Sequence, residues 1–599
     1  MKYNLIALLF FVSIIFTFLV NTNYVIAQPI PVELVQNEDG KWQLLRDGDP
    51  YFVQGAGGGG SLELLAKSGG NTIRTWGIGD DTAELLDEAH SHGLAVILGH
   101  WLGHERHGFD YSDPQMLAEQ RERVRKDVLR FKDHPAVLLW ALGNEMEGFE
   151  DGGNPAIWNH LQELAVMVKE LDPNHPIMTV TAEIGGERVR AVRNIAKDID
   201  IHGVNTYGGL PSMIDRYKTA GGTKPIIITE FGPPGTWETG TTEFGAPIEL
   251  TSTEKATVYR EAYQKGCLDH PNTCLGGLAF TWGSKMEATA TWFGMFLPTG
   301  EKLAAVDAMT ELWSGNQPGN LSPVINSFEL VGSNEIEAGN LFEIKLDAYD
   351  PEGDELRVEW KVRGEASEYF TGGDVQQTPF ELTGIIQKSN NTSATLKAPT
   401  EGVYRIYVSI FDKNGAAAVA NIPIKTIGKT EEVQLALPLA VYADNAPQPW
   451  FSSGWMGNTD KIKMDFESEI DPKTGEHALE VKYNGFDGWA GVAWQHPLND
   501  WGQQPGGFNL TGATKLTFWA RGKKGNEKIT FGIGILGDDV PYNDSVIKDM
   551  GEVKLSDKWK KYTIDLKGED LSRIKTPFFW RLGSPGFPVT FYLDDIKFE

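Results

Sequence analysis

The chain has 599 residues, of which 41% are hydrophobic and 11% aromatic, a composition typical of folded proteins that excludes extended disorder. Its length exceeds what a single hydrophobic core supports and predicts about three domains. The formal net charge of -28 at pH 7 excludes nucleic acid and anionic membrane surfaces as partners, because both repel an acidic protein. The same charge suits an uncharged partner and, equally, an acidic coat that keeps the protein in solution.

The N-terminus has the pattern of an export signal. Lys2 supplies a positive charge, the run from Leu5 to Val20 is apolar, and the small residue Ala27 precedes Gln28. The alternative is a membrane anchor, since the apolar run is near the lower limit for spanning a bilayer. No basic cluster follows the run, so we predict a signal peptide over residues 1–27 that is cleaved near Ala27. We therefore expect a secreted or periplasmic protein without stable membrane insertion.

Eight short apolar runs alternate with longer amphipathic segments over residues 28–314. This alternation predicts a (β/α)8 TIM barrel, for which about 250 residues is the usual size. A doubly wound parallel sheet is the alternative, but the number of runs and the polar residues at their ends favour the barrel. The expected strands are Tyr51–Gly55, Thr72–Trp76, Ala95–His100, Val137–Gly143, Ile177–Thr181, Ile201–Asn205, Ile226–Glu230 and Gly277–Trp282, and the clearest helices are Thr82–His92, Met116–Lys132 and Pro155–Leu171.

The only two cysteines of the chain, Cys267 and Cys274, flank one short loop. In an oxidising compartment they are expected to form a disulfide that closes this loop. The spacing of a CxxC zinc site is absent, so no metal is expected here.

Two all-β regions follow the barrel. Residues 324–427 contain short strands of alternating polarity and predict an immunoglobulin-like β-sandwich. Residues 433–599 predict a second, jelly-roll sandwich. Its first half is rich in tryptophan, and these side chains either form a surface that stacks against sugar rings or pack in the core, which we expect to claim at least two of them. They are Trp450, Trp455, Trp489, Trp494 and Trp501.

Two glutamates end predicted barrel strands. The apolar run from Leu138 ends in Asn144 and Glu145, and the run before Glu230 ends in that residue. In barrels of this kind the carboxyl ends of strands surround the active-site mouth. Two carboxylates about 5–5.5 Å apart are what retaining glycoside hydrolysis requires, one protonated and one ionised. Either glutamate alone would be read as a structural carboxylate, and the pair predicts this chemistry.

Gly143 to Glu145 at the end of the fourth strand, together with Thr229 to Gly232 at the end of the seventh, resemble the motifs of clan A glycoside hydrolases. The barrel of the family 2 enzymes is most similar, and endo-acting β-1,3-glucanases of the clan are similar too. The resemblance implies that Glu145 is the general acid/base and Glu230 the nucleophile. It also implies a β-linked polysaccharide or oligosaccharide substrate, with β-1,3-glucan as one candidate, and no cofactor for catalysis.

The same resemblance assigns further substrate-binding residues. Asn144 would contact the sugar 2-hydroxyl, and Arg74 would support the nucleophile. Asn205 ends the sixth strand and Tyr207 follows it, and Tyr207 matches a tyrosine that touches the nucleophile. Trp282, at the end of the predicted eighth strand, matches an aromatic platform beneath the sugar, with burial in the core as the alternative.

His100 and Trp101 end the third strand, and His104 and His107 follow them. A metal site is one interpretation, but no helix is expected to bring the histidines onto one face and no HExxH motif is present. We therefore expect no metal in the catalytic site and interpret His100 and Trp101 as substrate contacts.

The C-terminal sandwich resembles carbohydrate-binding modules of the jelly-roll type. This resemblance places a structural calcium ion near Asp594 and Asp595. Two other functions remain open for the whole chain. A transglycosylase would use the same two glutamates, and a non-catalytic glycan-binding protein would keep the barrel as a platform only.

Overall fold

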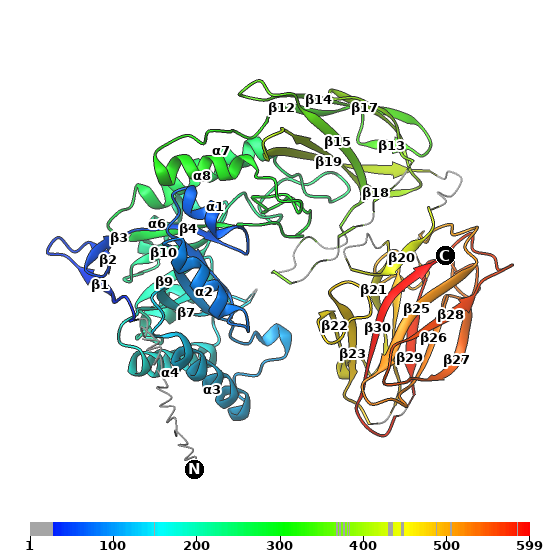
Figure 1. Cartoon of the computed structure of the whole chain (residues 1–599), viewed down its shortest axis with the longest axis horizontal. Coiled ribbons are helices and arrows are strands. Elements are labelled where there is room, and N and C mark those ends of the chain that lie inside the picture. Colours follow the sequence, from blue (N-terminus) through cyan, green and yellow to red (C-terminus); the bar gives the residue numbers. More distant parts are fainter. Residues whose placement is uncertain are drawn as a thin grey trace, which may run out of the picture.

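The computed structural model describes residues 28–599 except 149, 367–368, 370–372, 375, 377, 380, 383, 429–434, 445–448, 487, 504–505 and 584. The predicted signal peptide, residues 1–27, lies outside the described residues. Three groups of sheets follow one another along the chain, a barrel and then two sandwiches (Figure 1). This arrangement confirms the fold class predicted from the sequence.

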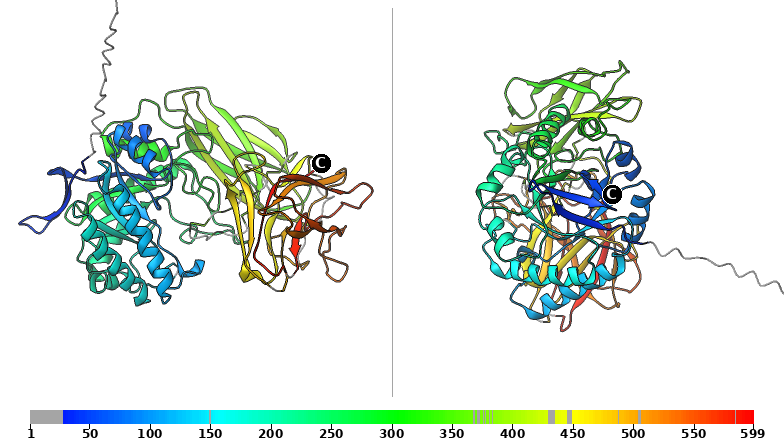
Figure 2. Two further views of the ribbon diagram at one scale, coloured as in Figure 1. Left: turned by 60° about the horizontal axis from the view of Figure 1, so that its bottom comes forward. Right: turned by 90° about the vertical axis from the view of Figure 1, so that its left-hand side faces the viewer.

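The first group is a closed barrel of eight parallel strands, in the spatial order β10-β11-β4-β5-β6-β7-β8-β9. Its strands are β4 (Val53–Gly57), β5 (Thr72–Arg74), β6 (Ala95–His100), β7 (Val137–Asn144), β8 (Ile177–Ala182), β9 (Ile201–Asn205), β10 (Ile226–Phe231) and β11 (Cys274–Phe280). Its helices are α1 (Leu62–Lys67), α2 (Thr82–Ser91), α3 (Pro114–Phe131), α4 (Pro155–Leu171), α5 (Arg188–Asn194), α6 (Leu210–Thr219), α7 (Ser252–Tyr263) and α8 (Ala304–Ser314). The helices surround the strands as a ring, which is clearest in the right-hand view of Figure 2.

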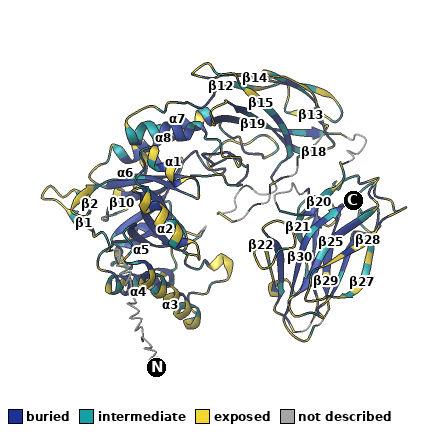
Figure 3. Ribbon diagram, viewed as in Figure 1, coloured by how far each residue is buried: buried dark blue, intermediate teal, exposed yellow. Residues whose placement is uncertain are grey.

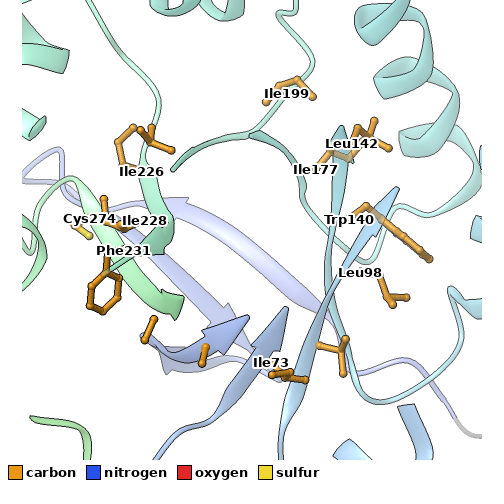
Figure 4. Close-up of a cluster of buried hydrophobic side chains, with 14 of the residues drawn as sticks. Ile73, Leu98, Trp140, Leu142, Ile177, Ile199, Ile226, Ile228, Phe231 and Cys274 are labelled. Atoms are coloured by element: carbon orange, nitrogen blue, oxygen red, sulfur yellow. The ribbon is translucent and has the colours of Figure 1, made fainter. Parts of the chain in front are cut away.

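Alternation of side chains along each strand divides the barrel into two apolar layers. On β6, Val96 and Leu98 pack outward with the helix-facing cluster, whereas Ile97 packs with the cluster inside the barrel. Figure 4 shows part of the outer layer, including Trp140 and Leu98 on neighbouring strands. Because both faces are covered, the strands are buried while the outer faces of the helices remain exposed (Figure 3).

The helices begin where the sequence provides caps. Asp113 accepts hydrogen bonds from the first backbone N–H groups of α3, and Asn154 does the same for α4. A proline occupies the first turn of each helix, where its missing N–H costs nothing. Cys267 and Cys274 form a disulfide between the end of the π-helical turn η2 (Gln264–Leu268) and the start of β11, which confirms the predicted pairing.

A small antiparallel sheet closes the amino end of the barrel. It consists of β1 (Val32–Gln36), β2 (Trp42–Arg46) and β3 (Asp49–Tyr51). Val32 and Trp42 donate to the carbonyls of Asn174 and Asn272, in the loops that precede β8 and β11. The carboxyl ends of the barrel strands, and with them the mouth, therefore lie at the opposite end.

The second group is a sandwich of two four-stranded sheets. One contains β12 (Val324–Val331), β14 (Leu341–Tyr349), β17 (Ser393–Lys397) and β16 (Ile386–Ser389). The other contains β13 (Glu335–Glu337), β19 (Ala417–Ile427), β18 (Gly402–Phe411) and β15 (Arg357–Gly364). Their inner faces share one apolar core, as expected for an immunoglobulin-like sandwich.

The third group is the jelly-roll sandwich. Its six-stranded sheet contains β22 (Ile462–Ser468), β23 (Ala478–Tyr483), β30 (Val589–Phe598), β25 (Lys515–Gly522) and β28 (Lys560–Asp565), with β20 (Leu439–Tyr442) paired to β30. Its five-stranded sheet contains β21 (Phe451–Gly457), β24 (Ala490–Gln495), β29 (Phe579–Leu582), β26 (Lys528–Ile533) and β27 (Lys548–Lys554). Short helical turns are η1 (Glu105–His107) and η3 (Thr459–Lys461). Within the described part of the chain, no helix is both long and apolar enough to cross a bilayer.

Candidate active site

Strands β7 and β10 carry the two predicted glutamates into one cavity of about 720 Å3 at the barrel mouth. Glu145 directly follows β7 and has a φ of 50°, a left-handed conformation that few residues other than glycine adopt. Its N–H donates to the carbonyl of Val180 on β8 at 2.9 Å, which fixes the turn. Glu230 is buried near the end of β10. Strain of this kind is often found at functional sites.

The carboxylate of Glu230 accepts hydrogen bonds from three side chains. Arg74 Nη1 and Trp76 Nε1 donate to its Oε1 at 2.9 and 2.7 Å, and the Tyr207 hydroxyl donates to its Oε2 at 2.8 Å. Arg74 comes from β5 and is only 1% exposed. Donors and a buried cation around one carboxyl stabilise its charged form. These contacts therefore fix the orientation of the Glu230 carboxylate.

Glu145 lies in a different environment from Glu230. Burial and, after it, the negative charge of Glu230 raise the pKa of the Glu145 carboxyl to about 8. Among the described residues, Asn205 Nδ2 is the side-chain donor to this carboxyl, at 2.7 Å. A carboxyl with such a pKa carries a proton at neutral pH and can donate it. The site thus combines a carboxyl of raised pKa with a carboxylate that is held by a cation and two further donors, and glycoside hydrolysis uses two carboxyls in different environments.

Asn144 connects the two halves of the site. Its Oδ1 accepts from Arg74 Nη2 at 2.6 Å and from Asn205 Nδ2 at 3.1 Å. Asn205 is oriented in turn by Thr229, whose hydroxyl donates to Asn205 Oδ1 at 2.8 Å. Because the oxygen of Asn144 is engaged by these donors, its amide nitrogen is the group that can face a sugar hydroxyl.

Of the predicted substrate-binding residues, Asn144, Trp101, Asn205 and Tyr207 line the cavity, and Arg74 lies behind Glu230. Two predictions are wrong. His100 does not reach the cavity, because its buried ring stacks on Trp140 and faces Asp127 of α3 at 3.6 Å.

Trp282 is the second correction. It is 0% exposed and donates its indole N–H to the Ser61 carbonyl at 3.0 Å. Its ring packs against Phe296 and Trp313 in the core. The eighth strand was expected to end at Trp282, but β11 ends at Phe280. The chain therefore leaves the barrel two residues earlier than the sequence suggested.

Phe280 occupies the place that the sequence analysis gave to Trp282. It lines the cavity and makes an edge contact with Trp76, with ring centroids 5.8 Å apart. It also packs against Tyr207 and Phe293. Phe280 already lay within the predicted strand, so an aromatic residue here was visible, but the sequence gave no way to choose it over Trp282.

Further residues of the cavity were not singled out from the sequence. Trp237, in the loop after β10, is 52% exposed and packs edge-on against Tyr207. Two cations line the cavity, and each is paired with a carboxylate. Arg188 pairs with Glu147 at 2.7 Å, and Lys285 pairs with Glu287 at 2.9 Å.

His104 and His107 belong to an aromatic stack. The ring of Trp101 is stacked on His104 with centroids 4.7 Å apart, and His104 is stacked on His107 at 5.5 Å. The described residues contain no group of three or more His, Cys, Asp or Glu side chains arranged to hold a metal ion.

The five tryptophans singled out in the jelly-roll sandwich form a buried set and an exposed set. Trp450 and Trp494 are buried in its core, whereas the remaining three tryptophans of the group are exposed. These are Trp455, Trp489 and Trp501.

The two aspartates near which a calcium ion was predicted are both paired with protein groups. Asp594 accepts backbone and hydroxyl hydrogen bonds from Thr474, and Asp595 pairs with Lys597 at 2.9 Å. The calcium ion near these two aspartates stays a prediction.

Residues 83–271 match the family model described as "Glycosyl hydrolases family 2, TIM barrel domain". A "Beta-glucuronidase" of Paenibacillus borealis is 29% identical over 173 residues, which cover 25% of this chain and 27% of that protein. A "Putative beta-glucuronidase" of Formosa agariphila is 27% identical over 156 residues, 26% of this chain and 12% of that protein. The matched part is therefore about a quarter or less of each relative's length.

Among solved structures, a Bacteroides uniformis beta-glucuronidase 2 covalently bound to cyclophellitol-6-carboxylate aziridine gives a TM-score of 0.38. Its identity is 13%, with 94% of this chain and 67% of that chain covered. A beta-D-glucuronidase of Dictyoglomus thermophilum gives a TM-score of 0.39 at 20% identity, covering 48% of this chain and 54% of that chain.

The closed eight-stranded barrel with two carboxyls in one cavity at its mouth is the arrangement that the sequence predicted for the catalytic domain of a glycoside hydrolase. The matched family model confirms that this domain resembles the barrels of family 2, within clan A. The model spans both Glu145 and Glu230, so the resemblance includes the candidate catalytic residues.

Proposed function

We propose that the protein is a retaining β-glycoside hydrolase that acts by double displacement on a β-linked glycan. The observation that carries this proposal is the contrast between the two carboxyls in one cavity. Glu145 has a pKa raised to about 8 and few donors, whereas Glu230 accepts from three donors. Retaining hydrolysis needs an acid and a nucleophilic anion in this relation.

In the first step, a Glu230 oxygen attacks the anomeric carbon while Glu145 donates its proton to the departing glycosidic oxygen. The carbon–oxygen bond to the leaving sugar breaks, and a glycosyl ester forms on Glu230. In the second step, ionised Glu145 takes a proton from water, and the resulting hydroxide displaces Glu230. Arg74, Trp76 and Tyr207 keep Glu230 oriented for both steps.

The charges of the cavity support an uncharged sugar as substrate. Arg188 and Lys285 are each already paired with a carboxylate, and Glu183 of the lining is paired with Arg216 at 2.8 Å. Glu238 adds a further carboxyl group to the lining. A uronic acid would have to compete with their carboxylate partners for Arg188 and Lys285. We therefore favour a neutral β-glycan, with β-1,3-glucan as the first candidate. A β-glucuronide is the second, because the matched relatives are named beta-glucuronidases.

A panel of substrates tests the proposal. Laminarin, lichenan, galactan and mannan would be incubated with the protein beside p-nitrophenyl β-glucoside, β-galactoside, β-mannoside and β-glucuronide. We expect turnover of a neutral member and, by NMR, a β-anomer as the first product. Release of the α-anomer would contradict double displacement, and turnover of the glucuronide alone would replace the substrate class. A 2-fluoro glycoside of the active sugar should label Glu230, as seen by mass spectrometry.

We also propose that the protein is exported and that its jelly-roll sandwich binds glycan. The apolar N-terminal run and the Cys267–Cys274 disulfide support export, because disulfides persist mainly in oxidising compartments. The exposed Trp455 and Trp489 support glycan binding by ring stacking. Replacing both by alanine should weaken retention of the full chain on the insoluble polysaccharide while leaving turnover of an aryl glycoside unchanged.

A further inference from the structure

The immunoglobulin-like sandwich is docked on the barrel by buried polar contacts. Arg405, which is 1% exposed, donates to the carbonyl of Pro247 at 2.9 Å. Asn421 Nδ2 donates to the buried Glu249 at 2.6 Å. Buried polar groups that are hydrogen-bonded across an interface favour one geometry of docking. The second domain therefore has a defined position relative to the barrel mouth.

From this sandwich, the connection between β15 and β16 extends to the mouth. Of its described residues, Gly373 lines the catalytic cavity together with both glutamates. On one side, the Tyr369 carbonyl accepts from the Thr236 hydroxyl at 2.5 Å, and Gln376 Oε1 accepts from the Ala288 N–H at 2.6 Å. Thr236 and Ala288 lie in the loops after β10 and β11.

Asp374 of the same connection reaches the opposite side, at the loop after β6. Its carboxylate accepts from Arg106 at 2.6 and 3.1 Å in a two-pronged contact. The ring nitrogen Nε2 of His107 lies 3.1 Å from Asp374 Oδ1. A segment of the second domain therefore contacts both sides of the mouth, and Asp374 is its attachment to the side that carries Trp101.

A continuous series of contacts leads from Asp374 into the cavity. His107 contacts Asp374 and is stacked on His104, which is stacked on Trp101 with an angle of only 4° between the rings. Trp101 is 39% exposed and lines the cavity beside Glu145. A flat aromatic face that is open to a glycan cavity suits the apolar face of a pyranose ring.

The Asp374 contacts do little for global stability, because ion pairs this exposed contribute about 0–1 kcal/mol. Their effect is local. A side chain that is already held in its binding orientation loses less conformational entropy when a ligand arrives. The stack of His104 and His107 holds Trp101, and Asp374 holds the end of the stack.

We propose that Asp374 is a positioning residue for Trp101, and that the second domain thereby sets the affinity for sugar units beyond the one that is cleaved. This inference rests on the proposed glycoside hydrolase function. It assigns a role in substrate binding to a domain outside the barrel.

The test compares Asp374→Asn with Glu335→Gln in the full chain. Glu335 forms a similarly exposed ion pair with Lys425 in the same sandwich, so its variant removes an equal charge without touching the connection. The substrates are the active p-nitrophenyl monosaccharide glycoside and the hexasaccharide of the polysaccharide that is hydrolysed (laminarihexaose for β-1,3-glucan). We expect Asp374→Asn to raise KM for the hexasaccharide about threefold to tenfold, with kcat and the monosaccharide parameters within about twofold. Glu335→Gln should match the wild type.

A double variant separates positioning from a general effect. In a Trp101→Ala background, Asp374→Asn should produce no further rise in KM, because the platform that it positions is gone. Calorimetric titration of the hexasaccharide into Glu230→Gln chains with and without Asp374→Asn should give the same ratio of affinities. An unchanged hexasaccharide KM in Asp374→Asn, or an equal rise in KM when Asp374→Asn is added to Trp101→Ala, would overturn this inference but not the proposed function. A wild type that hydrolyses no member of the panel would overturn the proposed function as well.

Discussion

Buried carboxylates occur both in the barrel mouth and in the jelly-roll core, but their surroundings differ. In the jelly roll, Asp500 pairs with the buried Lys575 and accepts the N–H groups of Gly502 and Gln503. Burial alone would raise its pKa, but Lys575 and the backbone donors outweigh it, so the pKa of Asp500 is lowered. In the mouth, burial and Glu230 raise the pKa of Glu145 to about 8.

Hydrogen-bond donors and access to a cavity, rather than burial, distinguish a buried carboxyl that can transfer a proton from a structural one. Burial is common to both regions and by itself indicates nothing about function. Asp500 is held by a buried cation and two backbone donors, so we interpret it as structural. Glu145 faces a cavity with few donors, which leaves its proton available for transfer.

Replacing the nucleophile should have the largest effect. Glu230→Gln keeps the shape of the side chain but removes the attacking anion, so we expect kcat to fall by at least about 10⁴-fold. The fold should persist, with circular dichroism unchanged. The matched control is Asp500→Asn in the jelly roll, the same acid-to-amide change at a buried site. It should lower the melting temperature and leave kcat intact. More than 1% residual turnover in Glu230→Gln would remove this residue as nucleophile.

Replacing the acid should have a smaller effect that depends on the leaving group. Glu145→Gln should lower kcat/KM by about 10²–10⁴-fold for a sugar leaving group. For a p-nitrophenyl leaving group, which needs little protonation, the first step should be affected much less. Equal losses for both substrates would contradict the role of Glu145 as acid.

The same variant tests the raised pKa of Glu145. The protonated acid is the active form, so wild-type kcat/KM should fall as pH rises through about 8, and this decrease should be absent in Glu145→Gln.

The raised pKa of Glu145 also predicts how stability depends on pH. The folded state binds this proton more tightly than the unfolded state, so the free energy of unfolding decreases as pH rises from the pKa of the unfolded state toward 8. The melting temperature of Glu145→Gln relative to the wild type should therefore increase between pH 5 and pH 8.

Breaking the jelly-roll pair should affect stability alone. Lys575→Met leaves Asp500 buried without its cation, which should destabilise that domain by about 3–5 kcal/mol. Turnover of an aryl glycoside at 25 °C should be unchanged. Calorimetric unfolding should place the loss in one transition. A fall in kcat beyond twofold would show that the two regions are coupled.

The smallest effect is expected from replacing the aromatic residues at the end of β11 and just after it, Phe280 and Trp282. Phe280→Ala should raise KM by roughly tenfold through loss of a stacking surface in the cavity. Trp282→Phe should leave KM unchanged and lower the melting temperature, because Trp282 packs in the core. The reverse pattern would restore Trp282 as the platform.

Much of the fold was predictable because it depends on local patterns. Apolar runs of strand length between amphipathic segments predicted the eight barrel strands, and five of them end within one residue of the observed strand at the mouth. The first, second and eighth differ by two residues at that end. For the eighth, the apolar sequence continues past the point where the chain leaves the barrel at Phe280. The small sheet β1–β3 was not predicted either.

The burial of individual side chains and the contacts between domains could not be predicted from the sequence. Trp450 and Trp455 have the same chemistry and neighbouring positions, yet one is buried and the other exposed. Asp374 and Arg106 are 268 positions apart, and neither has a local pattern that indicates a partner. Contacts of this kind depend on how complete domains dock, which periodicity does not encode.

The sequence by itself determined the sheet and helix pattern and the two glutamates at strand ends, because hydrophobic periodicity and the polarity at strand termini are local properties of the chain. The resemblance suggested a role for each glutamate, but only the tertiary structure showed their surroundings, with Glu145 beside one side-chain donor among the described residues and Glu230 held by three side chains from distant parts of the chain. The tertiary structure also decided that Phe280 rather than Trp282 lines the cavity, and that a second domain reaches the mouth. These outcomes depend on distances between atoms that are remote in the chain.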